Sequence, residues 1–176
     1  MKTINDFNFK NKKAIIRVDF NVPLNEKFEV TDLTRIQAAK PTIEKVLQDG
    51  GAVVLMSHLG RPKGVESKFS LRHIVDQVAE VMGTRVHFVE DCIGDQVTEA
   101  VDRLKSGEIL LLENLRFYAE ETTGDESFSE KLSKNGDVYV NDAFGTSHRA
   151  HSSMVGVTCP IRAAGDLLKK ELDYFG

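Results

Sequence analysis

Polar and charged residues that could bind a ligand gather in four short stretches of this 176-residue sequence. The stretches are Asp19-Phe20-Asn21-Val22-Pro23, His58-Leu59-Gly60-Arg61-Pro62, Glu113-Asn114-Leu115-Arg116-Phe117, and Asn141-Asp142 followed by His148, Arg149 and His151. The planar guanidinium group of arginine can bind two oxygens of a phosphate or carboxylate at once. Several such groups around one cavity would bind a small polyanion, and the neighbouring aspartate and asparagine side chains suit a hydroxyl group on it.

Each stretch also has a simpler interpretation when it is taken alone. Asp19 and Asn21 could form a turn before Pro23, and His58 could simply lie at the end of a strand. Arg61 could be a solvated loop residue. Arg116 could form a surface ion pair with Glu120 or Glu121. The two histidines of the last stretch could bind a metal ion, but the sequence places no third ligand beside them. We therefore predict no metal site.

Hydrophobic periodicity predicts the elements that would position these stretches. Strands are predicted at 14–20, 52–58, 85–89, 109–112 and 138–140; helices at 34–48, 71–82, 93–104 and 126–134; and loops at 60–68 and 119–125. Nearly continuous apolar strands that alternate with helices are typical of a parallel sheet covered on both faces. We predict an α/β fold, a three-layer α/β/α doubly wound parallel sheet of the Rossmann-like kind with about six strands.

The four polar stretches come directly after predicted strands. Because the carboxyl ends of parallel strands meet at one edge of the sheet, where such folds bind ligands, the stretches should converge there. Arg35, at the start of the helix predicted at 34–48, lies near the same edge. This convergence favours one shared pocket for a phosphorylated ligand over four independent surface features.

Composition and missing motifs argue against other classes of function. A net charge of -4 and a pI near 5.8 give no global basic field, so we predict neither a nucleic-acid partner nor a membrane partner. Two widely separated cysteines and no signal-peptide or membrane-helix pattern favour a cytoplasmic location. The phosphate-binding loop GxxxxGK[ST] is absent and GxGxxG does not follow the first strand, so we predict no cofactor or nucleotide site in this chain.

In order and spacing, the four stretches resemble the N-terminal domain of the phosphoglycerate kinase family. The similarity includes Arg17-Val18-Asp19, Ser57-His58-Leu59, Leu111-Leu112-Glu113 and Ala143-Phe144-Gly145 beside the residues above, and it covers essentially the whole chain. That family transfers a phosphoryl group between 1,3-bisphosphoglycerate and ADP to give 3-phosphoglycerate and ATP. The resemblance implies that this chain carries the triose-substrate site.

The resemblance also assigns roles to individual residues. The implied substrate-binding residues are Asp19, Phe20, Asn21, Arg35, His58, Leu59, Gly60, Arg61, Arg116 and Arg149. Among them, His58, Arg61, Arg116 and Arg149 would hold the 3-phosphate, while Asp19 and Asn21 would address the hydroxyl and carboxyl end. Arg35 matches the arginine that stabilises the phosphoryl group in flight, so it is the predicted catalytic residue.

The length of the chain limits which parts of the family's structure and activity we expect in it. By resemblance, residues 1–164 form the substrate-binding domain, residues 165–176 begin an interdomain helix, and the C-terminal nucleotide domain is absent. Mg-ADP or Mg-ATP would bind that second domain in the full-length protein, which we expect to be a monomer. Because phosphoryl transfer requires both substrates to meet in a closed cleft, we expect the chain to bind 3-phosphoglycerate or 1,3-bisphosphoglycerate but to be inactive without its C-terminal domain.

Two other hypotheses stay open at this point. The first is a stand-alone binding module for phosphorylated metabolites, which would use the same edge of the sheet without any chemistry. The second is an unrelated flavodoxin-like domain that binds a nucleotide. Arg35 and the linker-like terminal segment favour the kinase interpretation, because a simple binding module would need neither.

Overall fold

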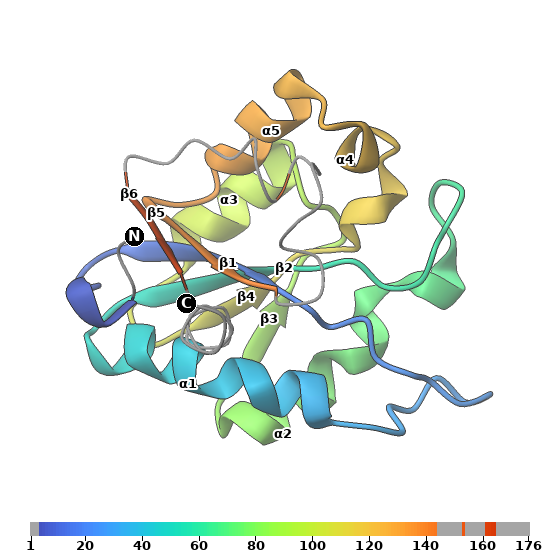
Figure 1. The fold of residues 1–176 in the computed structure, drawn as a ribbon, viewed down its shortest axis with the longest axis horizontal. Coiled ribbons are helices and arrows are strands. Elements are labelled where there is room, and N and C mark those ends of the chain that lie inside the picture. The colour runs from blue at the N-terminus through green and yellow to red at the C-terminus, as the bar shows by residue number, and fades with distance from the viewer. Residues whose placement is uncertain (1–3, 144–152, 154–160, 165–176) are drawn as a thin grey trace, which may run out of the picture.

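The computed structural model describes residues 4–143, 153 and 161–164, and its fold is drawn in Figure 1. Arg149, the two histidines beside it and the terminal segment 165–176 lie outside the described residues. The predictions made for them are therefore untested by the geometry that follows.

The described residues form one parallel sheet of six strands, as predicted. The strands are β1 (Lys13–Val18), β2 (Ala52–Met56), β3 (Val86–Phe88), β4 (Ile109–Leu111), β5 (Val138–Asp142) and β6 (Ile161–Ala164). They lie in the order β3-β4-β2-β1-β5-β6, with the first strand of the sequence near the middle. Because the order runs outward from β1 in both directions, the sheet is doubly wound, and the predicted fold class is confirmed. The sixth strand is one that hydrophobic periodicity did not locate.

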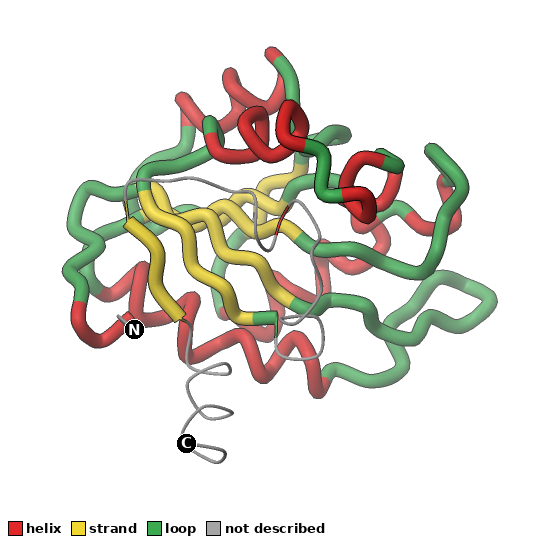
Figure 2. Tube along the Cα trace, turned by 45° about the horizontal axis from the view of Figure 1, so that its top comes forward, coloured by secondary structure: helices red, strands yellow, loops and turns green. Residues whose placement is uncertain are grey.

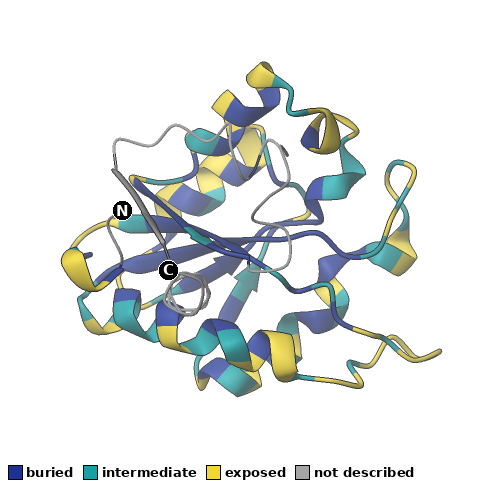
Figure 3. Cartoon of the chain, in the orientation of Figure 1, coloured by how far each residue is buried: buried dark blue, intermediate teal, exposed yellow. Residues whose placement is uncertain are grey.

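Helices cover both faces of the sheet, which accounts for the nearly continuous apolar strands. Figure 1 shows α1 (Thr34–Gln48) and α2 (Val75–Met82) on one face, and α3 (Asp95–Arg103) and α5 (Glu126–Ser133) on the other. Alternate strand residues point to the two layers, so Ile16 packs in the core under α1 while Ile15 packs in the core under α3 and α5. Every residue of β2 is buried, and β2 is dark blue in Figure 3.

The element bounds differ from the predictions in places that the backbone explains. Helix α1 has the predicted bounds, but α3 begins two residues later than predicted because Gly94, before it, has a positive φ of 100°. The predicted helix at 71–82 begins as a 3-10 turn over Leu71–Ile74 before α2. The predicted loop at 119–125 contains a short helix, α4 (Glu120–Thr123), which Gly124 ends in the left-handed conformation.

Candidate functional site

The segments that follow β1, β2 and β4 meet at one edge of the sheet, as predicted. In Figures 1 and 2 the chain leaves β1 and β2 at the same edge of the sheet. The register explains this arrangement, because Arg17 at the end of β1 pairs with Met56 at the end of β2 on one side and with Asn141 of β5 on the other. Residues just beyond these strands are therefore held within a few ångströms of each other.

The first cluster on this edge joins Asp19, Asn21 and Arg35. The Nη1 atom of Arg35 lies 3.1 Å from Oδ1 of Asp19 and donates a hydrogen bond of 2.7 Å to the carbonyl oxygen of Asn21. The side chain of Arg35 is 50% exposed, so the ion pair is open to water and contributes little to stability. Arg35 is thus held at the edge of the site with about half of its surface accessible.

The second cluster fixes the loop after β2. The Oδ1 atom of Asn21 accepts a hydrogen bond of 2.9 Å from the backbone N–H of Gly60, and Arg116 donates one of 3.3 Å to the carbonyl oxygen of Gly60. Gly60 has a φ of 64°, and a Cβ atom there would come within 2.5 Å of the Phe69 ring. Only glycine fits this position without strain, and the bonds to Gly60 connect three sequence-distant segments.

Asn114 holds the same loop from beneath. Its Oδ1 atom accepts from the backbone N–H groups of Leu59 and Arg116, and its Nδ2 group donates to the carbonyl oxygens of Leu59 at 2.7 Å and Phe69 at 2.9 Å. Asn114 is fully buried, so each of these bonds replaces one to water. The bonds orient the backbone of Leu59 and leave Arg61 at the solvent-facing end of the loop.

The arginines of the site differ in how they are held. Arg61 is exposed, and within the described part of the chain it makes no ion pair or side-chain hydrogen bond. Arg116 is half-buried and donates to the carbonyl oxygen of Gly60, and its positive charge acts on the carboxylate of Glu121. Asn141 lies within β5, which extends two residues beyond the predicted strand, and its Oδ1 atom accepts from the backbone N–H of Ala143.

A buried network beneath this edge was not predicted from the sequence. Arg17 is fully buried, and its Nη2 atom lies 2.9 Å from Nδ1 of His58. Its Nε donates to the hydroxyl of Ser153 at 2.9 Å, and both the hydroxyl and the backbone N–H of Ser153 donate to the carboxylate of Glu121. The hydroxyl of Tyr139 donates to the carbonyl oxygen of Ser153 at 2.6 Å.

Burial and charge act in opposite directions on the two ionisable ends of this network. Burial lowers the pKa of Arg17, and the nearby carboxylate of Glu121 partly offsets this effect. Burial raises the pKa of Glu121, and the charge of Arg17 partly offsets that effect. A charged residue in the middle of an apolar strand was the sequence signal for a buried partner, but nothing in the sequence identified that partner as Glu121.

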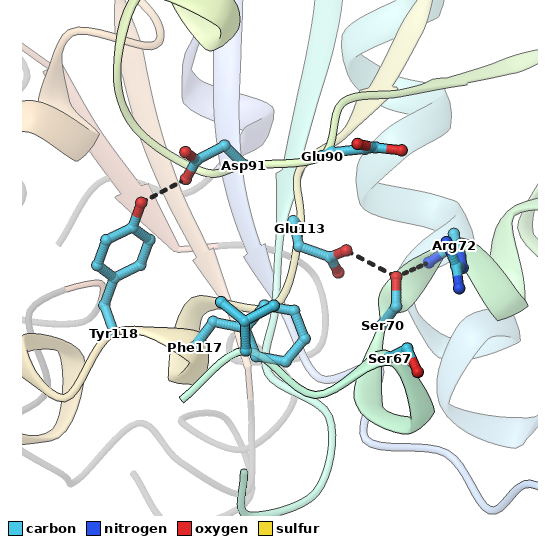
Figure 4. Close-up of a pocket in the computed structure, with 9 residues that line it drawn as sticks. Ser67, Ser70, Arg72, Glu90, Asp91, Glu113, Phe117 and Tyr118 are labelled. Carbon is cyan, nitrogen blue, oxygen red and sulfur yellow. Dashed lines mark hydrogen bonds between the residues drawn. The ribbon is translucent and has the colours of Figure 1, made fainter. Parts of the chain in front are cut away.

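A separate pocket of about 230 Å³ lies beyond the ends of β3 and β4 and is drawn in Figure 4. Its lining residues are Val65, Ser67, Ser70, Arg72, Glu90, Asp91, Glu113, Phe117 and Tyr118. The buried carboxylate of Glu113 accepts from the Ser70 hydroxyl at 2.6 Å and from the backbone N–H of Leu71 at 2.8 Å. Asp91 accepts from the Tyr118 hydroxyl at 2.7 Å. Three carboxylates against one arginine make this pocket unsuitable for a phosphate.

The described residues contain neither a metal-binding cluster nor a membrane-spanning helix. Among them, no group of three or more histidine, cysteine, aspartate or glutamate side chains could hold a metal ion. No helix in the same part of the chain is long and apolar enough to span a membrane.

The fold and the site together define a doubly wound α/β domain with a cation-rich rim at the carboxyl edge of its sheet. A model of the phosphoglycerate kinase family matches residues 4–176. The chain therefore belongs to the phosphoglycerate kinase family, and the family predicted from its motifs is confirmed.

Individual relatives agree with this assignment. The chain is 51% identical to a phosphoglycerate kinase of Borrelia hermsii over 99% of the chain and 45% of the relative, and 50% identical to one of Neurospora crassa over 98% and 46%. The crystal structure of phosphoglycerate kinase from Pyrococcus horikoshii superposes with a TM-score of 0.89, at 35% identity, over 98% of this chain and 44% of that one. The chain thus spans somewhat less than half the length of these relatives.

Proposed function

We propose that this chain is the triose-substrate-binding part of a phosphoglycerate kinase, an enzyme that transfers a phosphoryl group between 1,3-bisphosphoglycerate and ADP. Family membership supports the reaction class. The observation that carries the proposal for this part of the enzyme is the convergence of Asn21 and Arg116 on the backbone of Gly60. Those bonds bring the segments after β1, β2 and β4 into one rim, from which Arg61 extends into solvent.

In this proposal the rim binds the two ends of 3-phosphoglycerate differently. His58, Arg61 and Arg116, together with Arg149, bind the phosphate, because charge-assisted hydrogen bonds to phosphate oxygens are short and directional. Asp19 and Asn21 bind the hydroxyl and carboxyl end. The backbone of Phe20, Leu59 and Gly60 completes the wall. The N–H groups of these three residues donate hydrogen bonds to the side chains of Ser57, Asn114 and Asn21 respectively, which fix the segments.

Arg35 is proposed as the catalytic residue. Its guanidinium group pairs with Asp19 at 3.1 Å, and half of its side chain is open to solvent. A small rotation would bring the same group to the acyl-phosphate end of a bound triose. There it would stabilise the negative charge that spreads over the phosphoryl oxygens during transfer.

The nucleotide is proposed to bind outside this chain. Mg-ADP or Mg-ATP would occupy a C-terminal domain of the full-length protein, which also makes that domain the partner of this one. Phosphoryl transfer needs both substrates in line and shielded from water, so the chain alone should bind the triose phosphate without turning it over. A monomeric full-length enzyme in the cytoplasm is our expectation from the sequence.

Titration calorimetry tests the binding part of this proposal. We expect the chain to bind 3-phosphoglycerate and to give no heat with Mg-ADP under the same conditions. Binding of Mg-ADP with comparable affinity would contradict the proposal and favour the flavodoxin-like hypothesis.

A reconstitution experiment tests the enzymatic part. The chain would be mixed with a separately produced nucleotide domain and supplied with 1,3-bisphosphoglycerate and Mg-ADP. Formation of ATP in the mixture, with none from either part alone, is the expected result. Triose binding without ATP formation in the mixture would favour a stand-alone binding module instead.

A further inference from the structure

The guanidinium group of Arg17 is held by acceptors from several directions. Its Nε atom donates to the Ser153 hydroxyl at 2.9 Å, its Nη1 atom donates to the carbonyl oxygen of Val18, and its Nη2 atom lies 2.9 Å from Nδ1 of His58. Arg17 has no exposed surface, so water cannot replace any of these partners. The orientation of the group is therefore fixed.

The contact with His58 determines where the imidazole carries its proton. A guanidinium group has only N–H donors and no acceptor, and it stays charged inside proteins. In the contact between Nη2 and Nδ1, arginine must donate, so Nδ1 of His58 must accept through its lone pair. An imidazole whose Nδ1 accepts a hydrogen bond is neutral and has its only N–H at Nε2.

The wider network keeps Arg17 in this position. The Ser153 hydroxyl accepts from Arg17 and donates to the carboxylate of Glu121, so it connects the two opposite charges. A second bond of 2.8 Å, from the backbone N–H of Ser153, holds the other carboxylate oxygen of Glu121. Glu121 supplies the negative charge that balances the charge of Arg17. A carboxylate is therefore not required at the position of His58, and a neutral imidazole ring can occupy it.

We propose that Arg17 is a positioning residue that fixes His58 as the neutral tautomer with its proton on Nε2, so that His58 meets the ligand as a hydrogen-bond donor and not as a cation. This inference rests on the proposed function for the identity of the ligand, but not for the state of the ring. The residues of the rim then have different roles: the arginines supply the positive charge, and His58 supplies one directed N–H group.

The ionisable groups that act on Arg17 belong to neighbouring elements. Asp19 follows β1, Tyr139 lies on β5 and Glu121 lies on α4, and all three interact electrostatically with Arg17. Glu121 is separated from Arg17 by the Ser153 hydroxyl, and Asp19 pairs with Arg35. The contact of Nδ1 of His58 with Nη2 of Arg17 favours the unprotonated nitrogen.

Nitrogen NMR of the histidine rings tests this assignment directly, using the whole chain labelled with ¹⁵N. The signals of His58 are identified by their loss in a His58 variant. We expect Nδ1 to give the shift of an unprotonated, pyridine-type nitrogen and Nε2 that of a protonated, pyrrole-type nitrogen. This pattern should persist from about pH 8 to about pH 6, a range that spans the ordinary titration of histidine. A protonated Nδ1 in the neutral form, or an imidazolium ring across this range, overturns the proposal.

Arg17→Met tests whether Arg17 is the cause. It keeps most of the buried volume but removes the donors, so we expect the two tautomers of His58 to become mixed. An unchanged nitrogen spectrum in a folded Arg17→Met chain overturns the role of Arg17. If this variant does not fold, the wild-type spectrum and the two substitutions below still decide the assignment.

A matched pair of substitutions at His58 tests the consequence for binding. His58→Gln places an amide N–H group near the position of Nε2, whereas His58→Asn places a carbonyl oxygen near the position of Nδ1 and leaves no donor near Nε2. We expect His58→Asn to weaken 3-phosphoglycerate binding by about tenfold to a hundredfold and His58→Gln to weaken it less. The reverse order overturns the proposal. If the wild-type chain binds no 3-phosphoglycerate, the proposed function fails while the nitrogen spectrum still decides the state of His58.

Discussion

Two regions at the carboxyl edge of the same sheet have opposite chemistry. The rim beyond β1 and β2 collects Arg35, Arg61 and Arg116, and it is supported by the buried guanidinium of Arg17. The pocket beyond β3 and β4 collects carboxylates, of which Asp91 and Glu113 accept hydrogen bonds from the protein itself. Position after a strand therefore does not by itself give a segment the positive charge of the proposed site. The rim has an exposed cation, Arg61, whose N–H donors bind no group in the described part of the chain. In the pocket, by contrast, the carboxylate acceptors bind donors of the protein itself.

This comparison predicts that substitutions in the rim affect binding while substitutions in the pocket affect stability. Arg17 should be the exception in the rim, because it is buried and supports the site from below. Four substitutions test the contrast.

The largest expected effect is on stability, from Arg17→Met. Removing one member of a buried charged network leaves Glu121 without its counter-charge, and such losses are about 3 to 5 kcal/mol in the free energy of unfolding. Urea denaturation measures the change. The double variant Arg17→Met with Glu121→Gln should recover part of the loss, because no unpaired charge is then buried. A loss below about 1 kcal/mol in the single variant would mean that the network is not an energetic unit.

Arg61→Ala should weaken 3-phosphoglycerate binding by about tenfold to a hundredfold, because a charge-assisted hydrogen bond contributes about 1.5 to 3 kcal/mol. Stability should change by less than about 0.5 kcal/mol, since Arg61 is exposed. Arg72→Ala is the matched control, because Arg72 is also exposed but lines the acidic pocket. Calorimetry should find unchanged affinity for Arg72→Ala. Equal losses of affinity in both variants would indicate a general effect of surface charge and not a binding site. Arg149→Ala should weaken binding as Arg61→Ala does.

Glu113→Gln tests the pocket. The carboxylate of Glu113 accepts from Ser70, Leu71 and Asn114, and a neutral amide cannot accept at both ends. We expect a loss of about 1 to 3 kcal/mol in the free energy of unfolding, with little change in the affinity for 3-phosphoglycerate. Glu90→Gln is the control, because Glu90 lines the same pocket but is exposed. A large loss of triose binding without a loss of stability would place the pocket in the site.

Tyr118→Phe should have the smallest effect, a loss of about 1 kcal/mol from the missing hydrogen bond to Asp91. Burial, and then the bond to Asp91, raise the pKa of Tyr118 above its ordinary value. The folded chain thus keeps this proton while the unfolded chain loses it above about pH 10. The contribution of Tyr118 to stability is full below that pH and declines as the pH rises further. Denaturation curves at several alkaline pH values should have a smaller decline in Tyr118→Phe, and an identical decline would contradict this account.

Much of the fold could be predicted because its signals are local. The spacing of Ile36, Ala39 and Ile43 is a local pattern that matches the full extent of α1, and Gly83, a residue type typical of helix ends, ends α2 in the left-handed conformation. The short helix α4 was missed because it has few apolar residues. Its one buried carboxylate, Glu121, is stabilised by a partner 32 residues away.

The composition of the site was also predictable, since arginine, asparagine and histidine follow strands that must end together. The buried hydrogen bonds that support the candidate site could not be predicted. Arg17 and Ser153 are 136 residues apart, and no pattern in the sequence connects them. Asn114 belongs to one of the four polar stretches, but its hydrogen bonds to the backbone of Leu59 and Arg116 depend on the distance between two loops.

By itself, the sequence determined the α/β class, the parallel order of elements and the family, because apolar periodicity and short motifs are properties of neighbouring residues. Only the tertiary structure decided which polar groups are engaged and which are available. It paired Arg35 with Asp19, tied Asn21 and Arg116 to Gly60, and set Arg17 against His58. The physical reason is that hydrogen bonds and desolvation act over a few ångströms, so the chemistry of each side chain depends on neighbours that only folding brings together.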